Sequence, residues 1–267
     1  MKMPVFYLSH GGGPWPWMEG STRYDTALLR CLQELPQQLP TTPTAILMVS
    51  AHWESENSTF LVQANPNPDM YYDYYNFPEH TYQVRYPAPG NPDLAQHVKK
   101  LVLDAGGQAQ LDTERGFDHG AFVPAFVMYP DATVPMIQLS IDASYDPALH
   151  VQLGQALRSL REQGVLILGS GASYHNLRLM GTEGAAPSVA FDNWLEQALV
   201  QTPDYANRLR HIEQWSLAPA ARIAHAREDH LVPLFVVLGA SDEHDAVTRI
   251  LSSRSPTGIM NASYRFG

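Results

Sequence analysis

Four histidines lie where an α/β protein usually places its chemistry. His10 follows a short apolar run that predicts a first strand, and His52 and His175 follow two further runs of the same kind. His230 stands at the expected start of an apolar helix. In open α/β sheets, ligands bind outside the carboxyl ends of the strands, so these side chains are expected to meet in one crevice. Neutral imidazole is the commonest side-chain metal ligand, and clusters from distant parts of a chain suit a transition-metal site.

The surroundings of these histidines fit a place where a bound molecule lies against backbone, because His10 is followed by three glycines. His225 is five residues from His230, and a regular helix would put the two rings about 140° apart. We therefore expect His225 to lie in the preceding loop, as a contact to the substrate or to a metal ligand. His119 is another expected loop histidine near the site, beside the Asp118 carboxylate that would fix its tautomer.

Other catalytic patterns do not match the sequence. GSGAS is not the G-x-S-x-G nucleophile motif, no Gly-Lys-Ser/Thr phosphate loop occurs, and GGGPWPW is not a dinucleotide-binding motif. The single cysteine, Cys31, excludes an internal disulfide, which fits a reducing compartment. The other histidines lie in polar or helical settings and are expected to be solvated: His80, His97, His150, His211 and His244.

Composition is that of an ordinary globular protein, with 45% hydrophobic residues and a net charge of −10 over 267 residues. The chain has 17 basic and 27 acidic residues and no basic run, which argues against nucleic acid or an anionic membrane as partner. The longest apolar run, LVPLFVVLGA, is half the length of a bilayer span. We expect a cytoplasmic protein without a targeting or membrane segment.

The pattern of elements predicts one α/β domain over residues 1–267, with a central, mostly parallel mixed sheet flanked by helices. Short apolar runs typical of buried strands alternate with amphipathic segments. The expected strands are Val5–Leu8, Ala45–Ala51, Phe60–Ala64, Val134–Ile141 and Val165–Ser170. The expected helices are Thr22–Leu35, Pro92–Asp104, Asp146–Gln163, Ser188–Gln201 and Asp229–Gly239.

One long segment, 65–91, has little periodicity but carries five prolines and seven Tyr or Phe residues. Loops of this length inside a domain are usually functional or disordered, and the aromatic content argues against disorder. Its aromatic side chains are expected to line or cover a pocket, or else to pack the loop onto the body or form a subunit interface. Tyr72 is the candidate substrate contact, and Arg85 is a candidate for a substrate carboxylate.

The segments SHGGGP, VSAHWE, YPAPGNP, GFDHGAFVP, PMIQLSID, LGSGASYHNL and AHAREDHLVPL occur in this order. As an ordered set they resemble the class III extradiol ring-cleavage dioxygenases, and within them the single-chain branch of 4,5-DOPA dioxygenases. The resemblance spans His10 to about Gly239. It implies a single α/β domain that holds one non-haem Fe(II) or Zn(II) ion and inserts O₂ into a catechol, giving a muconic semialdehyde.

By match of motif, the resemblance implies that His10, His52 and His230 bind the metal. His175 would be the catalytic acid and base, and His119 would line the substrate pocket. Relatives of the protocatechuate type complete the metal triad with a glutamate where this sequence has His230, and the neighbouring Glu228 is therefore a reserve ligand. The partners implied are a small aromatic diol and O₂; the sequence does not predict an oligomeric state.

Two other functions remain open from the sequence. A zinc hydrolase would use the same three histidines and a metal-bound hydroxide, with His175 as proton shuttle. The absence of a glutamate next to a ligand, as in H-E-x-x-H, counts against it. The third interpretation is a non-catalytic metal-binding protein that keeps the pocket for interaction with a partner.

Overall fold

The protein is built on an eight-stranded mixed sheet with the strand order β4-β3-β5-β2-β6-β1-β8-β7. The structure is a computed structural model and describes residues 2–267. The four neighbours β5, β2, β6 and β1 are parallel, whereas β3 and β8 run antiparallel to them. This confirms the predicted mostly parallel sheet. The strands are β1 (Val5–Ser9), β2 (Ala45–Ser55), β3 (Thr59–Gln63), β4 (Gln108–Asp112), β5 (Met136–Asp142), β6 (Val165–Gly171), β7 (Val247–Arg254) and β8 (Met260–Phe266).

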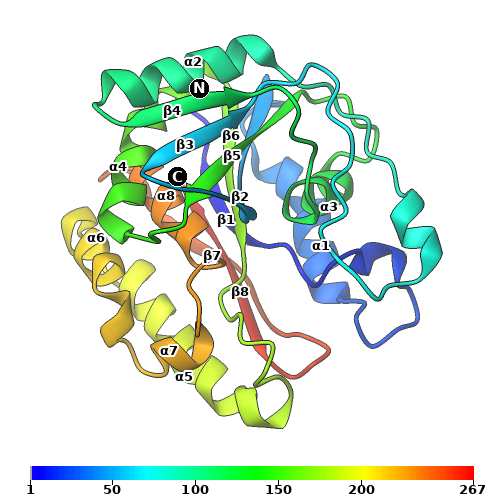
Figure 1. Cartoon of the computed structure of the whole chain (residues 1–267). Coiled ribbons are helices and arrows are strands. Elements are labelled where there is room, and N and C mark those ends of the chain that lie inside the picture. The colour runs from blue at the N-terminus through cyan, green and yellow to red at the C-terminus, as the bar shows by residue number, and fades with distance from the viewer. Residues whose placement is uncertain (1) are drawn as a thin grey trace.

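Helices cover both faces of the sheet (Figure 1), with α1 and α3 on one side and most of the others on the opposite side. None of the helices within residues 2–267 is long and apolar enough to cross a membrane. The helices are α1 (Thr26–Glu34), α2 (Pro92–Asp104), α3 (His119–Met128), α4 (Pro147–Leu157), α5 (Thr182–Leu199), α6 (Tyr205–Glu213), α7 (Ala221–Ala224) and α8 (Val232–Ala240).

The sheet separates two hydrophobic cores. Along β1, Val5 and Tyr7 pack into the core beneath α2, α4 and α8, and Phe6 and Leu8 pack into the core beneath α1 and α3. Successive side chains of a strand point to opposite faces, so a strand covered on both faces must be apolar throughout. This is why the central strands read as continuous apolar runs in the sequence.

Several elements differ from the sequence prediction. Helix α3 was not expected, because it contains Pro124 and is apolar on all sides, so it has no amphipathic period. Strands β4, β7 and β8 were also missed, since they are edge strands or carry polar residues. Helix α1 begins at Thr26, where the Asp25 side chain accepts hydrogen bonds from two backbone amides and caps the helix. His150, expected in solvent, is buried and its Nε2 accepts from the Asp142 amide at 2.9 Å.

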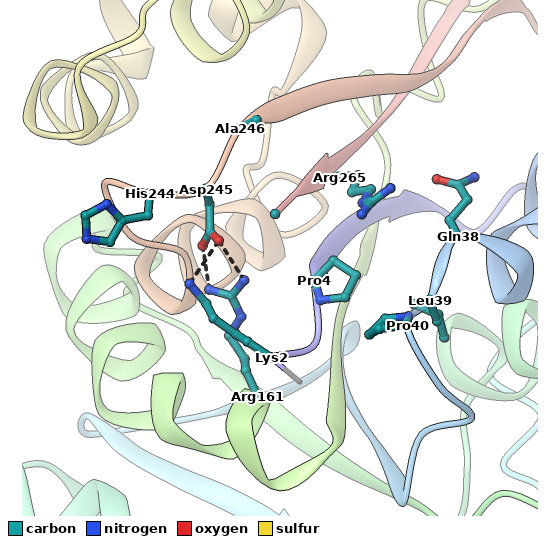
Figure 2. A pocket seen from close by; sticks show the side chains of 11 residues that line it. Lys2, Pro4, Gln38, Leu39, Pro40, Arg161, His244, Asp245, Ala246 and Arg265 are labelled. Carbon is teal, nitrogen blue, oxygen red and sulfur yellow. Dashed lines mark hydrogen bonds and ion pairs between the residues drawn. The ribbon is translucent and has the colours of Figure 1, made fainter.

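An open cavity of about 490 Å³ lies at the end of β1 opposite to His10. Figure 2 shows that its central charges face one another. The buried Arg161 guanidinium donates to both oxygens of Asp245, at 2.5 and 3.0 Å, and Lys2 Nζ donates to the same carboxylate at 3.0 Å. Arg161 also donates to two backbone carbonyl oxygens. These contacts join the segment before β1, the segment after α4, the end of α8 and the segment before β7, so the cluster stabilises the fold.

The variant Asp245→Asn is expected to lose about 3–5 kcal/mol of unfolding free energy at pH 7, since it leaves a buried guanidinium without its counter-charge. Burial opposes ionisation of Asp245, but the hydrogen bond and charge of Arg161 outweigh it and lower the pKa of the carboxyl below 3.8. A carboxyl group whose pKa is lower in the folded than in the unfolded protein stabilises the folded state at any pH above its unfolded pKa of about 3.9. This stabilisation is lost as the pH falls through the pKa of the folded state.

Urea unfolding of the wild type and of Asp245→Asn between pH 7 and pH 2 measures this loss. The difference in unfolding free energy between the two proteins should become smaller as the pH approaches 2. The matched control is Asp69→Asn, which removes an ion pair with Arg85 whose side chains are 84% and 65% exposed. That variant should lose less than about 1 kcal/mol. Equal losses in the two variants would contradict the role given to Asp245.

Candidate active site

The carboxyl edge of the parallel strands places the histidines. His10 directly follows β1, and its amide donates to the Gly171 carbonyl at the end of β6 at 3.1 Å. His52 lies in β2 where the pairing with β5 shifts register between Val49 and Glu54. Such an irregularity turns a side chain away from its regular direction. His230 lies two residues before α8, in the loop that precedes the helix.

These three rings point their Nε2 atoms at one another. His52 Nε2 lies 3.2 Å from His10 Nε2 and 3.2 Å from His230 Nε2. The ligand atoms of the three residues all lie within 4.8 Å of each other. Two nitrogens bound to one tetrahedral ion at about 2.0–2.1 Å would be about 3.3 Å apart. The spacing therefore matches three ligands of a single metal ion.

The protonation of the rings supports the same conclusion. His52 Nδ1 lies 3.2 Å from Asp73 Oδ2, and His230 Nδ1 lies 3.2 Å from Asp229 Oδ2. A carboxylate beside Nδ1 favours a proton there and leaves a lone pair on Nε2. Burial, together with the neighbouring imidazoles, lowers the pKa of His52 and His230 well below 6.5, so both rings are neutral. Two lone pairs then face each other at 3.2 Å, an arrangement that a cation between them would stabilise.

The backbone beside His230 is held by the central strands. Its carbonyl oxygen accepts a hydrogen bond from the Tyr7 hydroxyl at 2.8 Å and from the Ala172 amide at 3.1 Å. A Cβ atom at Gly171 would lie 2.0 Å from the same oxygen. Only glycine fits at this close approach of β6 to the loop, so residue 171 sets the position of the third histidine.

His175 lies directly against this cluster, and with Asp229 and His230 it forms a second group of side chains whose ligand atoms lie within 4.8 Å of one another. Its ring stacks on that of His230, with the centroids 3.4 Å apart and 15° between the planes. Its Nδ1 lies 3.8 Å from Asp229 Oδ1. Burial, followed by the charge of His119, lowers the pKa of His175 to about 4, and burial raises the pKa of Asp229 to about 6. His175 is therefore a neutral base at neutral pH, next to the converging nitrogens.

Asp73 is a site residue that the sequence reasoning missed. It lies in the segment 65–91, called here the aromatic segment. Its Oδ1 accepts from both Nδ1 and the backbone amide of His119, at 2.7 and 3.0 Å, and its Oδ2 faces His52. Burial opposes ionisation of Asp73, but the hydrogen bond and charge of His119 outweigh it and lower the pKa. The expectation that Asp118 orients His119 is wrong. Asp118 caps α3 and binds Ser50, and His119 is the first residue of that helix.

One cavity of about 690 Å³ contains the cluster and its neighbours. The glycines after His10 form part of its lining, as expected from the sequence. The aromatic segment supplies one wall, and the turn between β7 and β8 supplies another that was not predicted. The lining residues include His10, His52, His119, His175, His230, Asp73, Asp229, Tyr74, Tyr75, Phe77, Ser255, Thr257 and Asn261.

Comparison with known proteins matches residues 4–267 to a family described as the catalytic LigB subunit of aromatic ring-opening dioxygenase. The chain belongs to this family. It is 40% identical to the 4,5-DOPA dioxygenase extradiol of Beta vulgaris, over 84% of this chain and 83% of the relative. It is 35% identical to the protein of the same name from Escherichia coli, over 92% of this chain and 88% of the relative. The ordered motifs were therefore a correct guide to the family.

Two further relatives extend the comparison. A protein of Hapsidospora irregularis named dioxygenase tasH is 36% identical over 91% of this chain and 80% of its own length. The crystal structure of an uncharacterized protein from Escherichia coli aligns over 100% of both chains with a TM-score of 0.79 and 30% sequence identity. The ring-opening dioxygenase family and its fold thus cover the chain throughout, and the family makes this protein an oxidoreductase.

Three of the candidate site residues from the sequence lie elsewhere, two from the aromatic segment 65–91 and one from the family resemblance. Tyr72 does not line the cavity; its hydroxyl donates to the Val84 carbonyl at 2.6 Å. Arg85 pairs with Asp69 outside the cavity, so it is no longer a candidate for a substrate carboxylate. The reserve ligand Glu228 pairs with Arg222 at 2.7 Å and is outside the groups of side chains that could hold a metal.

His225 is fully buried between Phe191 and Trp215 and does not reach the cavity. Burial lowers its pKa to about 3, and its ring Nε2 lies 3.1 Å from the Ser173 carbonyl oxygen, to which the neutral ring donates. Next to it, the His175 amide donates to the Ala224 carbonyl at 2.9 Å. The residues around α7 therefore hold the segment that carries His175, and His225 is a positioning residue.

Replacing His225 by phenylalanine is expected to lower kcat by about tenfold with little change in KM. The lost hydrogen bond to the buried Ser173 carbonyl costs about 1–2 kcal/mol, and this loss weakens the support of the segment that positions His175. Steady-state kinetics separates the two constants, and the metal content should stay at the wild-type value. The variant His211→Phe, on an exposed position of α6, is the matched control. A drop in bound metal together with kcat would instead show a general structural defect.

Proposed function

We propose that residues 1–267 act as a single catalytic domain that cleaves a catechol-type, DOPA-like ring by extradiol insertion of O₂, giving a muconic semialdehyde. The proposal is carried by one observation: the Nε2 atoms of His10 and His230 each lie 3.2 Å from that of His52, in a cavity that also holds the stacked His175. The names of the relatives support it, since two of them are 4,5-DOPA extradiol dioxygenases.

His10, His52 and His230 would hold the metal, with Fe(II) as the active ion and Zn(II) as the alternative. A bound divalent ion supplies Lewis acidity toward the catechol oxygens and open positions for the diol and O₂. Asp73 and Asp229 each place a carboxylate oxygen 3.2 Å from Nδ1 of one ligand ring, which favours the proton at that nitrogen. Three neutral ligands leave the ion with its full charge, which favours an anionic catecholate.

His175 would take the proton from the second catechol hydroxyl at a ring nitrogen and return it as the ring opens. Its stacking on His230 keeps the ring beside the metal position, and His119 faces the same space, 5.0 Å from the His10 ring. Tyr74 and Phe77 in the cavity wall suit a flat aromatic substrate and exclude water from the reaction.

The chain should work in the cytoplasm, because its lone cysteine is a buried free thiol that suits a reducing compartment. The deciding experiment is metal analysis of protein purified without O₂, followed by assay with Fe(II) and a panel of catechols. The expected result is one ion per chain, O₂ uptake and a yellow semialdehyde. Ester or peptide hydrolysis with zinc would favour the hydrolase, and inactivity on every substrate would favour a non-catalytic protein.

A further inference from the structure

Arg23 is the one lysine or arginine that lines the large cavity within residues 2–267. It belongs to the segment before α1, and its side chain forms no ion pair with the described residues. Its guanidinium lies over the Phe77 ring, 4.6 Å from the centroid. An arginine stacked on an aromatic face keeps its planar set of donors free for another partner.

The acidic side chains of the cavity are already engaged. Asp25 accepts hydrogen bonds from the Ala27 and Leu28 amides at the start of α1. Asp73 and Asp229 face the imidazoles of the metal cluster. No carboxylate of the described residues therefore pairs with the Arg23 guanidinium. An anionic group of a bound molecule would supply the missing partner.

The location of Arg23 links it to the cluster. The Phe77 ring on which it stacks lies against Gly13, since a Cβ atom there would be 2.7 Å from the ring. Gly13 is three residues after His10, so its Cα lies within about 11 Å of the Cα of that histidine. The histidine cluster, the glycines and Arg23 therefore line one continuous cavity, in which a molecule bound at the metal position can extend toward the guanidinium.

We propose that Arg23 selects substrates by the charge of the group attached to the catechol ring, favouring catechols with a carboxylate on a short side chain. The inference rests on the proposed ring-cleavage function and adds to it the residue that recognises the substituent. Guanidinium and carboxylate match through two parallel hydrogen bonds, which a neutral amide cannot reproduce.

The test measures equilibrium binding by calorimetry to Zn(II)-loaded protein, without O₂, so that no turnover occurs. The probes are dihydrocaffeate, a catechol with a propionate side chain, and its primary amide. Wild-type protein should bind the acid about tenfold more tightly than the amide. Arg23→Gln should bring the acid to the affinity of the amide and leave the amide unchanged. Arg23→Lys should keep part of the preference, and Arg85→Gln, outside the cavity, should keep all of it.

Equal affinities for acid and amide in the wild type, or an undiminished preference in Arg23→Gln, would overturn the assignment of Arg23 and leave ring cleavage standing. Binding of neither catechol would overturn the proposed function and this inference with it. Since Arg23 is exposed on a loop, its variants should fold as the wild type does, which circular dichroism checks.

Discussion

Replacing His175 by phenylalanine should lower kcat by about 10²–10⁴-fold, the range that a positioned acid or base contributes. Phenylalanine keeps a flat ring that can stack on His230 but has no nitrogen to take or return a proton. Metal content and anaerobic affinity for the catechol should therefore stay close to the wild-type values. Stopped-flow turnover of Fe(II)-loaded protein measures kcat, metal analysis measures the bound ion, and titration with the catechol in the absence of O₂ measures the affinity.

His97→Phe is the matched control for this variant, since His97 lies on α2 and outside the cavity. It should retain full activity. Normal turnover by a His175→Phe protein that binds iron and catechol would remove His175 from the mechanism. Loss of metal in that variant would instead make it a ligand.

Removing one converging imidazole is expected to have the largest effect on metal binding. His52→Ala should weaken metal affinity by more than about 100-fold, because even residues that only orient a ligand change affinity by about 10–100-fold. Activity should fall in parallel. A metal titration followed by thermal unfolding measures the effect, since an ion that binds only the folded state raises the melting temperature.

Wild-type protein should gain about 2.7 kcal/mol of stability when the metal is present at a hundred times its Kd. The His52→Ala variant should gain far less at the same concentration, and a chelator should abolish the gain in the wild type. His150→Gln is a suitable control, because His150 is buried but does not line the cavity. Equal gains in wild type and His52→Ala would show that the ion binds elsewhere.

The placement of the histidines was predictable because it depends on local signals. Apolar runs mark the strands, and a residue after a parallel strand must lie at the carboxyl edge of the sheet. His10 and His175 are such residues. The helix α2 was predicted over the same range, Pro92–Asp104, from its Asn91 cap and its first-turn proline. Each of these inferences needs only a few neighbouring residues.

The remainder of the site depends on contacts between distant segments. Asp73 reaches His119 across 46 positions of the chain, and nothing in the spacing of the aromatic segment distinguishes it from a solvated aspartate. The turn between β7 and β8 forms a cavity wall only because β8 pairs with β1. His225 has the residue type of a site histidine, yet its burial between two aromatic rings decides its role.

The hydrogen bonds to the His230 carbonyl have a consequence for how such enzymes diverge. Tyr7, whose hydroxyl donates to this carbonyl, is fully buried in the middle of the molecule and tolerates little change, and the second donor, the Ala172 amide, belongs to the backbone. Arg23 and Phe77 lie in connecting segments that can accept substitutions and insertions. Evolution can therefore alter which aromatic compound is accepted without disturbing the chemistry performed on it.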